Sequence, residues 1–230
     1  MYFWVICTKI NSLDTSNYII NDLAPFDIGA PLSEVKKAFR ALTYSHVPIT
    51  RAGVYAGTLS KTDTLCLDSA QTIDEVAYVL TPFFVALETN WLDIIEAFAK
   101  HQSNIMPVLD QQHNYVGYYE LADIMDLFNH TPFLSESGGI LVVEKGSHDY
   151  SFSEICQIIE SNDGRIYGMF ISKIDSDLTQ ATIKIGHHGI AAICQTFRRY
   201  GYHVVATHDQ DTAQQALQDR SQYLDKYLNI

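Results

Sequence analysis

The residues of this chain best suited to bind a ligand are a hydroxyl and a carboxylate three positions apart, Ser60 and Asp63. Both side chains accept hydrogen bonds, and Ser60 also donates one. A second pair, Glu120 and Asp123, follows sixty residues later and has a carboxylate in place of the hydroxyl. Residues of these types also cap the start of a helix, because their oxygens accept hydrogen bonds from its first N–H groups. Ligand binding and helix capping are therefore both open for the two pairs.

Motifs of the common enzyme classes are missing from the sequence. There is no Gly-x-Gly-x-x-Gly loop, no Walker-type loop and no Gly-x-Ser-x-Gly elbow. The nine histidines include the neighbours His187 and His188, but no helical His-x-x-x-His pair with a third carboxylate ligand. We therefore predict no catalytic residues and no metal site. The cysteines are scattered, which indicates buried thiols in a reducing compartment: Cys7, Cys66, Cys156 and Cys194.

The two candidate pairs belong to an internal duplication. Residues 35–39 (VKKAF) align with 94–98 (IIEAF) at an offset of 59, and Pro48 aligns with Pro107 at the same offset. After one inserted residue, the stretch 57–63 aligns with 117–123 at an offset of 60. Two copies are too few for a solenoid, so we expect an intramolecular pair with pseudo-twofold symmetry. The groove between its two halves is a natural ligand site.

The first copy reads as a helix, a hairpin and a second helix. An apolar stripe over 32–42 predicts a helix with Pro31 in its first turn, and 45–49 predicts a short strand. Gly53 and Gly57 indicate a hairpin, after which Ser60 begins a short helix. We assign this copy to residues 17–70 and treat residues 1–16 as an N-terminal extension.

The same elements recur in the second copy, assigned to residues 71–130. We expect a helix capped by Asn90 that runs through His101, strands over 105–109 and 115–119, and a helix over 121–128. Breaker residues over 131–139 then indicate a linker.

The pattern changes after the linker. Residues 138–208 read as strand, helix, strand, strand, helix and strand, the split βαβ or ferredoxin-like order. Residues 209–230 carry apolar side chains at helical spacing and predict a helical tail that packs against this domain or a neighbouring subunit. The expected fold class is α+β.

Composition and charge exclude several classes of partner. The formal net charge of -12 argues against nucleic acid, whose phosphates need clustered Lys and Arg. The apolar start, residues 1–7, is too short to cross a membrane and has no basic stretch ahead of it. We therefore expect a cytoplasmic protein.

The doubled unit resembles a pair of cystathionine-β-synthase (CBS) domains. The shared pattern is apolar-Pro-apolar, a turn, and Gly-apolar-apolar-Ser/Thr-x-x-Asp, carried by Pro48, Gly57, Asp63, Pro107, Gly117 and Asp123. The resemblance implies a flat module with two clefts. Each cleft of that family takes an adenosine nucleotide (AMP, ADP or ATP) or S-adenosylmethionine, with the aspartate on the ribose and the Ser/Thr near the phosphates.

By this resemblance, the ligand-binding residues are Ser60, Asp63, His46, Val47, Glu120 and Asp123. Glu120 stands where the family has a hydroxyl, and two like charges about 4 Å apart repel by about 4 kcal/mol at an effective dielectric of about 20. We therefore expect a nucleotide in the first cleft, and only a neutral or cationic ligand in the second.

Residues 138–208 resemble an ACT-type regulatory domain in the order of their elements and in the turn that contains Gly164. The resemblance implies small effectors, such as amino acids, bound between copies. The expected architecture is a CBS-pair module followed by a ferredoxin-like (ACT-like) domain. The expected function is that of a non-catalytic sensor, a homodimer that regulates a separate protein. The alternative is a structural dimerisation module whose clefts bind nothing.

Overall fold

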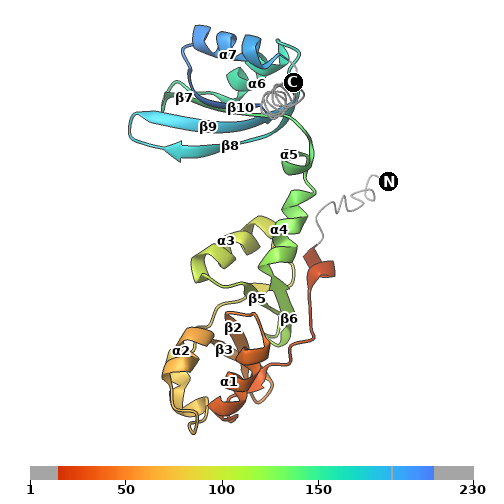
Figure 1. The fold of residues 1–230 in the computed structure, drawn as a ribbon, viewed down its shortest axis with the longest axis vertical. Coiled ribbons are helices and arrows are strands. Elements are labelled where there is room, and N and C mark those ends of the chain that lie inside the picture. Colours follow the sequence, from red (N-terminus) through yellow and green to blue (C-terminus); the bar gives the residue numbers. More distant parts are fainter. Residues whose placement is uncertain (1–14, 188, 210–230) are drawn as a thin grey trace, which may run out of the picture. The chain divides into compact units, whose positions relative to one another are not determined.

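The computed structural model describes residues 15–187 and 189–209 and divides the chain into two compact units, with the division between Phe128 and Asn129 (Figure 1). The duplicated segment lies in the first unit. The second unit holds the strand-helix-strand-strand-helix-strand segment. Each unit is described by itself.

The first repeat is a three-stranded sheet with helices packed on it. Its elements are η1 (Thr15–Tyr18), β1 (Phe26–Asp27), α1 (Leu32–Ala41), β2 (His46–Arg51), β3 (Val54–Ser60) and α2 (Lys61–Cys66). Strand β1 runs parallel to β2, and β2 pairs antiparallel with β3. The apolar stripe of α1 (Leu32, Val35 and Phe39) packs on Val47, Ile49 and Leu59 of the sheet.

The second repeat has the same order and the same register. Its elements are η2 (Asp74–Val79), β4 (Val85–Ala86), α3 (Trp91–His101), β5 (Ile105–Leu109), β6 (Tyr115–Glu120) and α4 (Leu121–Asn129). Phe26 lies opposite Ile49 in the first sheet, and Val85 lies opposite Val108 in the second, each pair at the sequence offset of 59. The duplication seen in the sequence is therefore also a duplication of structure.

In each repeat, a short segment ahead of the first strand pairs with a strand of the other repeat. We call this segment the arm of its repeat. Ile20, ahead of β1, exchanges two backbone hydrogen bonds with Tyr118 of β6, at 2.8 and 2.9 Å. Thr81, ahead of β4, does the same with Thr58 of β3, at 2.9 and 3.0 Å. The arm explains why glycine occupies position 117, since a Cβ there would clash with the carbonyl oxygen of Ile20.

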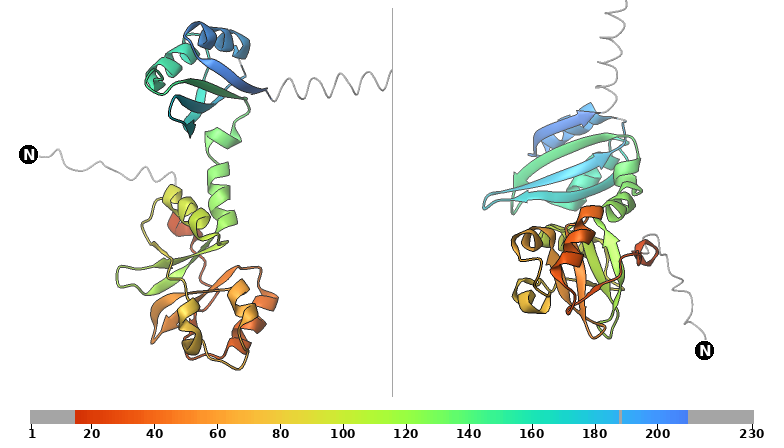
Figure 2. Two further views of the ribbon diagram at one scale, coloured as in Figure 1. Left: turned by 90° about the vertical axis from the view of Figure 1, so that its left-hand side faces the viewer. Right: turned by 60° about the horizontal axis from the view of Figure 1, so that its bottom comes forward.

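The second unit contains α5 (Pro132–Ser135), β7 (Gly139–Gly146), α6 (Phe152–Glu160), β8 (Ile166–Ile174), β9 (Leu178–Ile185), α7 (Ile190–Arg199) and β10 (His203–Asp209). Its sheet has the order β10-β7-β9-β8, and all three strand pairs are antiparallel. Helices α6 and α7 lie on one face of the sheet, as Figure 2 shows, and pack on Leu141, Val143 and Ile183. The element order predicted for residues 138–208 is present.

Four local predictions are corrected. Pro31 is the extended N-cap residue of α1 and lies outside its first turn. The first hairpin turns at Ala52 and Gly53, which both have positive φ, whereas Gly57 lies within β3. The linker contains the short helix α5. Cys66 is exposed, whereas Cys194 is buried and Cys156 half-buried.

Two predicted segments fall mostly outside the described residues. These are the N-terminal extension, with Cys7, up to residue 14, and the tail beyond Asp209, the last residue of β10. Over the described ranges, no helix has both the length and the apolar character needed to cross a membrane.

Candidate functional site

Two aromatic groups from the second repeat lie against the start of β2. The ring of His46 meets the ring of Phe83 edge-on, with 5.2 Å between their centroids. His101, the last residue of α3, stacks on Phe83 at 4.5 Å with only 14° between the ring planes. Phe83 is 3% exposed, while His101 and His46 are partly exposed. His101 therefore forms the outer layer of a stack that both repeats build.

The candidate pair Ser60 and Asp63 forms a helix cap at the start of α2. The Ser60 hydroxyl accepts the backbone N–H of Asp63 at 2.9 Å and donates to the Asp63 carboxylate at 2.6 Å. The capping role open in the sequence is thus present. The Asp63 side chain remains exposed, so it can still accept bonds from a ligand.

The Asp63 carboxylate acts electrostatically on His46. Burial lowers the pKa of His46, the Asp63 carboxylate raises it in part, and His101 lowers it further. Burial also lowers the pKa of His101, with a smaller contribution from Lys100. Both imidazoles are therefore neutral near pH 7, and the exposed charges that act on them are the Asp63 carboxylate and the Lys100 ammonium group. Val47, in contrast, is 0% exposed and belongs to the core of the first repeat.

The second candidate pair is Glu120 and Asp123, and Glu120 is hydrogen-bonded by a side chain of the first repeat. Tyr44, from the first repeat, donates its hydroxyl proton to the Glu120 carboxylate at 2.7 Å. The hydroxyls of Tyr44 and Tyr118 are 2.7 Å apart, and Tyr118 donates to Asp22 at 2.7 Å. Glu120 is thus already bonded from the opposite repeat. Burial raises the pKa of Asp123, and the nearby carboxylates Glu120 and Asp126 raise it further.

The sequence patterns gave no indication of Tyr44, Asp22, Phe83 or His101 as site residues. Tyr44 and Asp22 of the first repeat bond Glu120 and Tyr118 of the second, and Phe83 of the second repeat, on which His101 stacks, meets His46 of the first. The pseudo-twofold symmetry could have indicated these residues. In such a pair, residues that precede the strands of one repeat face the motif of the other.

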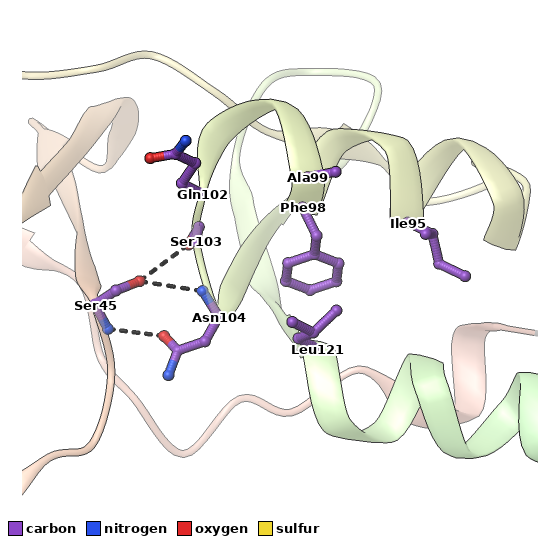
Figure 3. Close-up of a pocket in the computed structure, with 8 residues that line it drawn as sticks. All are labelled: Ser45, Ile95, Phe98, Ala99, Gln102, Ser103, Asn104 and Leu121. Atoms are coloured by element: carbon purple, nitrogen blue, oxygen red, sulfur yellow. Dashed lines mark hydrogen bonds between the residues drawn. The ribbon is translucent and has the colours of Figure 1, made fainter.

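A pocket of about 580 Å³ lies elsewhere in the first unit, between the end of α3, the start of α4 and the residue before β2. Figure 3 shows Phe98 and Leu121 pointing toward one another there, with Ser45 facing the end of α3. It contains none of the predicted site residues. Its lining is Ser45, Ile95, Phe98, Ala99, Gln102, Ser103, Asn104 and Leu121.

Metal coordination has no support from side-chain clustering. Within residues 15–187 and 189–209, no three His, Cys, Asp or Glu side chains gather closely enough to hold a metal ion.

No protein-family model matches the chain, and no curated protein sequence does either. Solved structures that resemble it are CBS domain pairs, at low identity. A CBS domain pair/ACT domain protein from Thermotoga maritima has 21% identity and a TM-score of 0.46, over 50% of this chain and 96% of that one. The CBS domains of a transcriptional regulator from Streptococcus pneumoniae have 18% identity and a TM-score of 0.45, over 50% and 98%. CBSX2 in complex with AMP has 14% identity and a TM-score of 0.43, over 49% and 93%.

Proposed function

We propose that this chain is a non-catalytic regulatory protein whose repeats, residues 17–70 and 71–130, form a CBS-type pair that binds an adenosine ligand in the first cleft. The observation that carries the proposal is the grouping of Asp63 and His46 from one repeat with Phe83 and His101 from the other. In the second cleft, Glu120 stands at the position equivalent to Ser60 and is already hydrogen-bonded by Tyr44. The molecule therefore offers one adenosine site.

The chemistry of the first cleft suits a nucleoside. The outward face of His101 can stack on a purine, and aromatic pairs of this kind contribute about 0.5–1.5 kcal/mol beyond their buried area. The exposed Asp63 carboxylate can accept hydrogen bonds from ribose hydroxyls. Because both imidazoles are neutral at pH 7, they offer stacking and hydrogen bonds but no charge to AMP, ADP, ATP or S-adenosylmethionine.

The ligand would be regulatory because both repeats contribute contacts to it. A ligand held by both repeats stabilises the arrangement in which Asp63 and His101 face the same molecule, and it shifts the population by its difference in affinity for the two arrangements. We propose that the second unit is an ACT-like ferredoxin fold that passes this change to a separate, regulated protein. Its support is the strand-helix-strand-strand-helix-strand order. A cytoplasmic homodimer is part of the same proposal.

A ligand screen on the full chain tests the binding claim. We expect AMP, ADP, ATP or S-adenosylmethionine to raise the melting temperature, because a ligand that binds only the folded state stabilises it by RT ln(1 + [L]/Kd). Asp63→Asn removes the charge and retains the side-chain size, so it should abolish the shift. The matched variant Asp123→Asn should retain most of it. Equal losses from the two variants would contradict the distinction between the clefts.

A structural dimerisation module is the alternative function, and two observations favour it. Ser60 and Asp63 satisfy one another as a helix cap without any ligand, and Glu120 is bonded to Tyr44. If none of the four ligands changes the melting temperature at millimolar concentration while the chain remains a dimer, this alternative replaces the sensor.

A further inference from the structure

Each repeat of the first unit carries two helices that lie side by side. In the first repeat, the ammonium group of Lys36 in α1 donates to the carbonyl oxygen of Leu67, directly after α2, at 2.6 Å. In the second repeat, Trp91 at the start of α3 packs on Phe128 near the end of α4, with 5.4 Å between the ring centroids. Because the two sheets share one register, the helices α1 and α2 are equivalent to α3 and α4.

Both pairs of helices expose large apolar side chains. Leu65 of α2 is 70% exposed, and Met125, at the equivalent position of α4, is 42% exposed. Leu92 of α3 is exposed as well. An apolar side chain that is exposed at the same place in both repeats indicates a contact with another protein surface.

The two pairs of helices differ in charge. With histidine counted as neutral, α1 and α2 carry four basic residues and two carboxylates, whereas α3 and α4 carry one lysine and four carboxylates. The sign reverses at one repeated position, where the first repeat has Lys37 and the second has Glu96. Both side chains are exposed, and neither forms an ion pair within the described part of the chain. The equivalent surfaces are therefore complementary in charge.

Two orientations of a symmetric dimer bring these surfaces together. In a parallel dimer each repeat meets its own copy, so Lys37 lies against a second lysine and Glu96 against a second glutamate. In an antiparallel dimer each repeat meets the other repeat of the partner. Lys37 then lies against Glu96 of the partner subunit, and the twofold axis produces this contact twice. Like charges that face one another across an interface disfavour association, whereas opposite charges favour it.

We propose that two copies of this chain associate antiparallel, with α1 and α2 of each copy against α3 and α4 of the other. The inference rests on the homodimer of the proposed function and specifies its interface. The exposed Leu65 and Met125 supply the apolar part of the contact, and the charges determine its orientation.

Sedimentation equilibrium of the full chain tests the orientation. Lys37→Glu and Glu96→Lys each place like charges at both symmetry-related contacts, so each should raise the dimer dissociation constant by about tenfold at low salt. The double variant makes the charges opposite again and should restore the original dissociation constant. Glu88→Lys changes an exposed glutamate of the second repeat outside α3 and α4. It is the matched control and should leave the dissociation constant unchanged.

The outcomes separate the orientations. In a parallel dimer, each single reversal only exchanges one pair of like charges for another, so an unchanged dissociation constant would overturn the proposal. A double variant that associates no more tightly than the single variants would also overturn it. A full chain that is monomeric at micromolar concentration would assign these helices to a different protein and refute the contact between copies.

The ligand site is tested separately on the same variants. Neither Lys37 nor Glu96 belongs to the group of side chains around Asp63 and His101, so both variants should keep the shift in melting temperature that AMP produces. If AMP shifts the melting temperature of none of these proteins while the charge reversals behave as expected, the sensor fails and the antiparallel dimer stands.

Discussion

Ser45 and Asn104 occupy the same position in the two repeats and bind each other. The backbone N–H of Ser45 donates to the Asn104 side-chain oxygen at 2.7 Å, and the backbone N–H of Asn104 donates to the Ser45 hydroxyl at 3.1 Å. The residues are 59 positions apart, which is the offset of the duplication. Val54 and Asn114 also occupy equivalent positions, at the turns of the two hairpins, and they form a backbone bridge with one another. The pseudo-twofold axis therefore passes between these pairs.

The Ser45–Asn104 exchange should hold the repeats together. Asn104→Ala leaves the Ser45 N–H without its acceptor, and we expect a loss of about 1–3 kcal/mol of unfolding free energy, measured by urea denaturation. Ser45→Ala removes the other bond, which the Asn104 backbone N–H donates to the Ser45 hydroxyl, and it should also lower the unfolding free energy. Thr62→Ala, at an exposed position of α2, is the control. Variants of Ser45 and Asn104 that are as stable as Thr62→Ala would show that the exchange contributes nothing to stability.

Gly117 should tolerate no side chain. In Gly117→Ala the new Cβ would crowd the carbonyl oxygen of Ile20, so the arm must move, and we expect a loss of about 1–3 kcal/mol. Gly186→Ala is the comparison, since its Cβ would meet nothing nearer than 3.6 Å. Chemical denaturation of both variants checks the prediction. A Gly117→Ala protein as stable as Gly186→Ala would show that the arm is dispensable.

His46 should make stability depend on pH. Burial lowers its pKa in the folded protein, so the unfolded chain binds the proton more readily. Stability is then complete above the unfolded pKa of about 6.5 and falls as the pH drops below it. Unfolding free energies at pH 7 and pH 5 should differ less in His46→Gln than in the unmodified protein. His148→Gln, in an exposed loop of the second unit, should keep the original difference. An unchanged difference in His46→Gln contradicts the assignment.

Opening the second cleft should create a second nucleotide site. The double variant Tyr44→Phe with Glu120→Thr removes the bond between these residues and the negative charge, and it restores a hydroxyl. We expect calorimetry with ATP to show two sites per chain instead of one. Tyr78→Phe, at an 80% exposed ring, is the control. An unchanged stoichiometry would mean that something other than Glu120 and Tyr44 keeps ATP out.

The described cysteines should differ in reactivity. Cys66 is exposed, whereas Cys194 is buried and its thiol pKa is raised by burial, which keeps it protonated. Alkylation followed by mass spectrometry should label Cys66 well before Cys194. Equal rates would indicate that α7 opens readily.

The element boundaries could be predicted from the sequence because they depend on local signals. Apolar spacing placed α1 and α3, and Asn90 and Ser60 marked the helix starts that the structure shows. The side chains that face the candidate residues from the opposite repeat could not be predicted in this way. Tyr44 and Phe83 reach their places only through the association of the two repeats, and the burial of Val47 depends on the helix that packs over it. Local periodicity carries no information about such contacts.

The exchanged arms have a consequence for how the first unit can be divided. The segment with Ile20 and the segment with Thr81 each complete a sheet in the half to which they do not belong. Two polypeptides cut between α2 and η2 would each carry an arm without its strand and a strand without its arm. We expect such fragments to reassociate, because each holds the pairing partner of the other's arm. A single repeat produced alone should dimerise by pairing its arm with a second copy of itself.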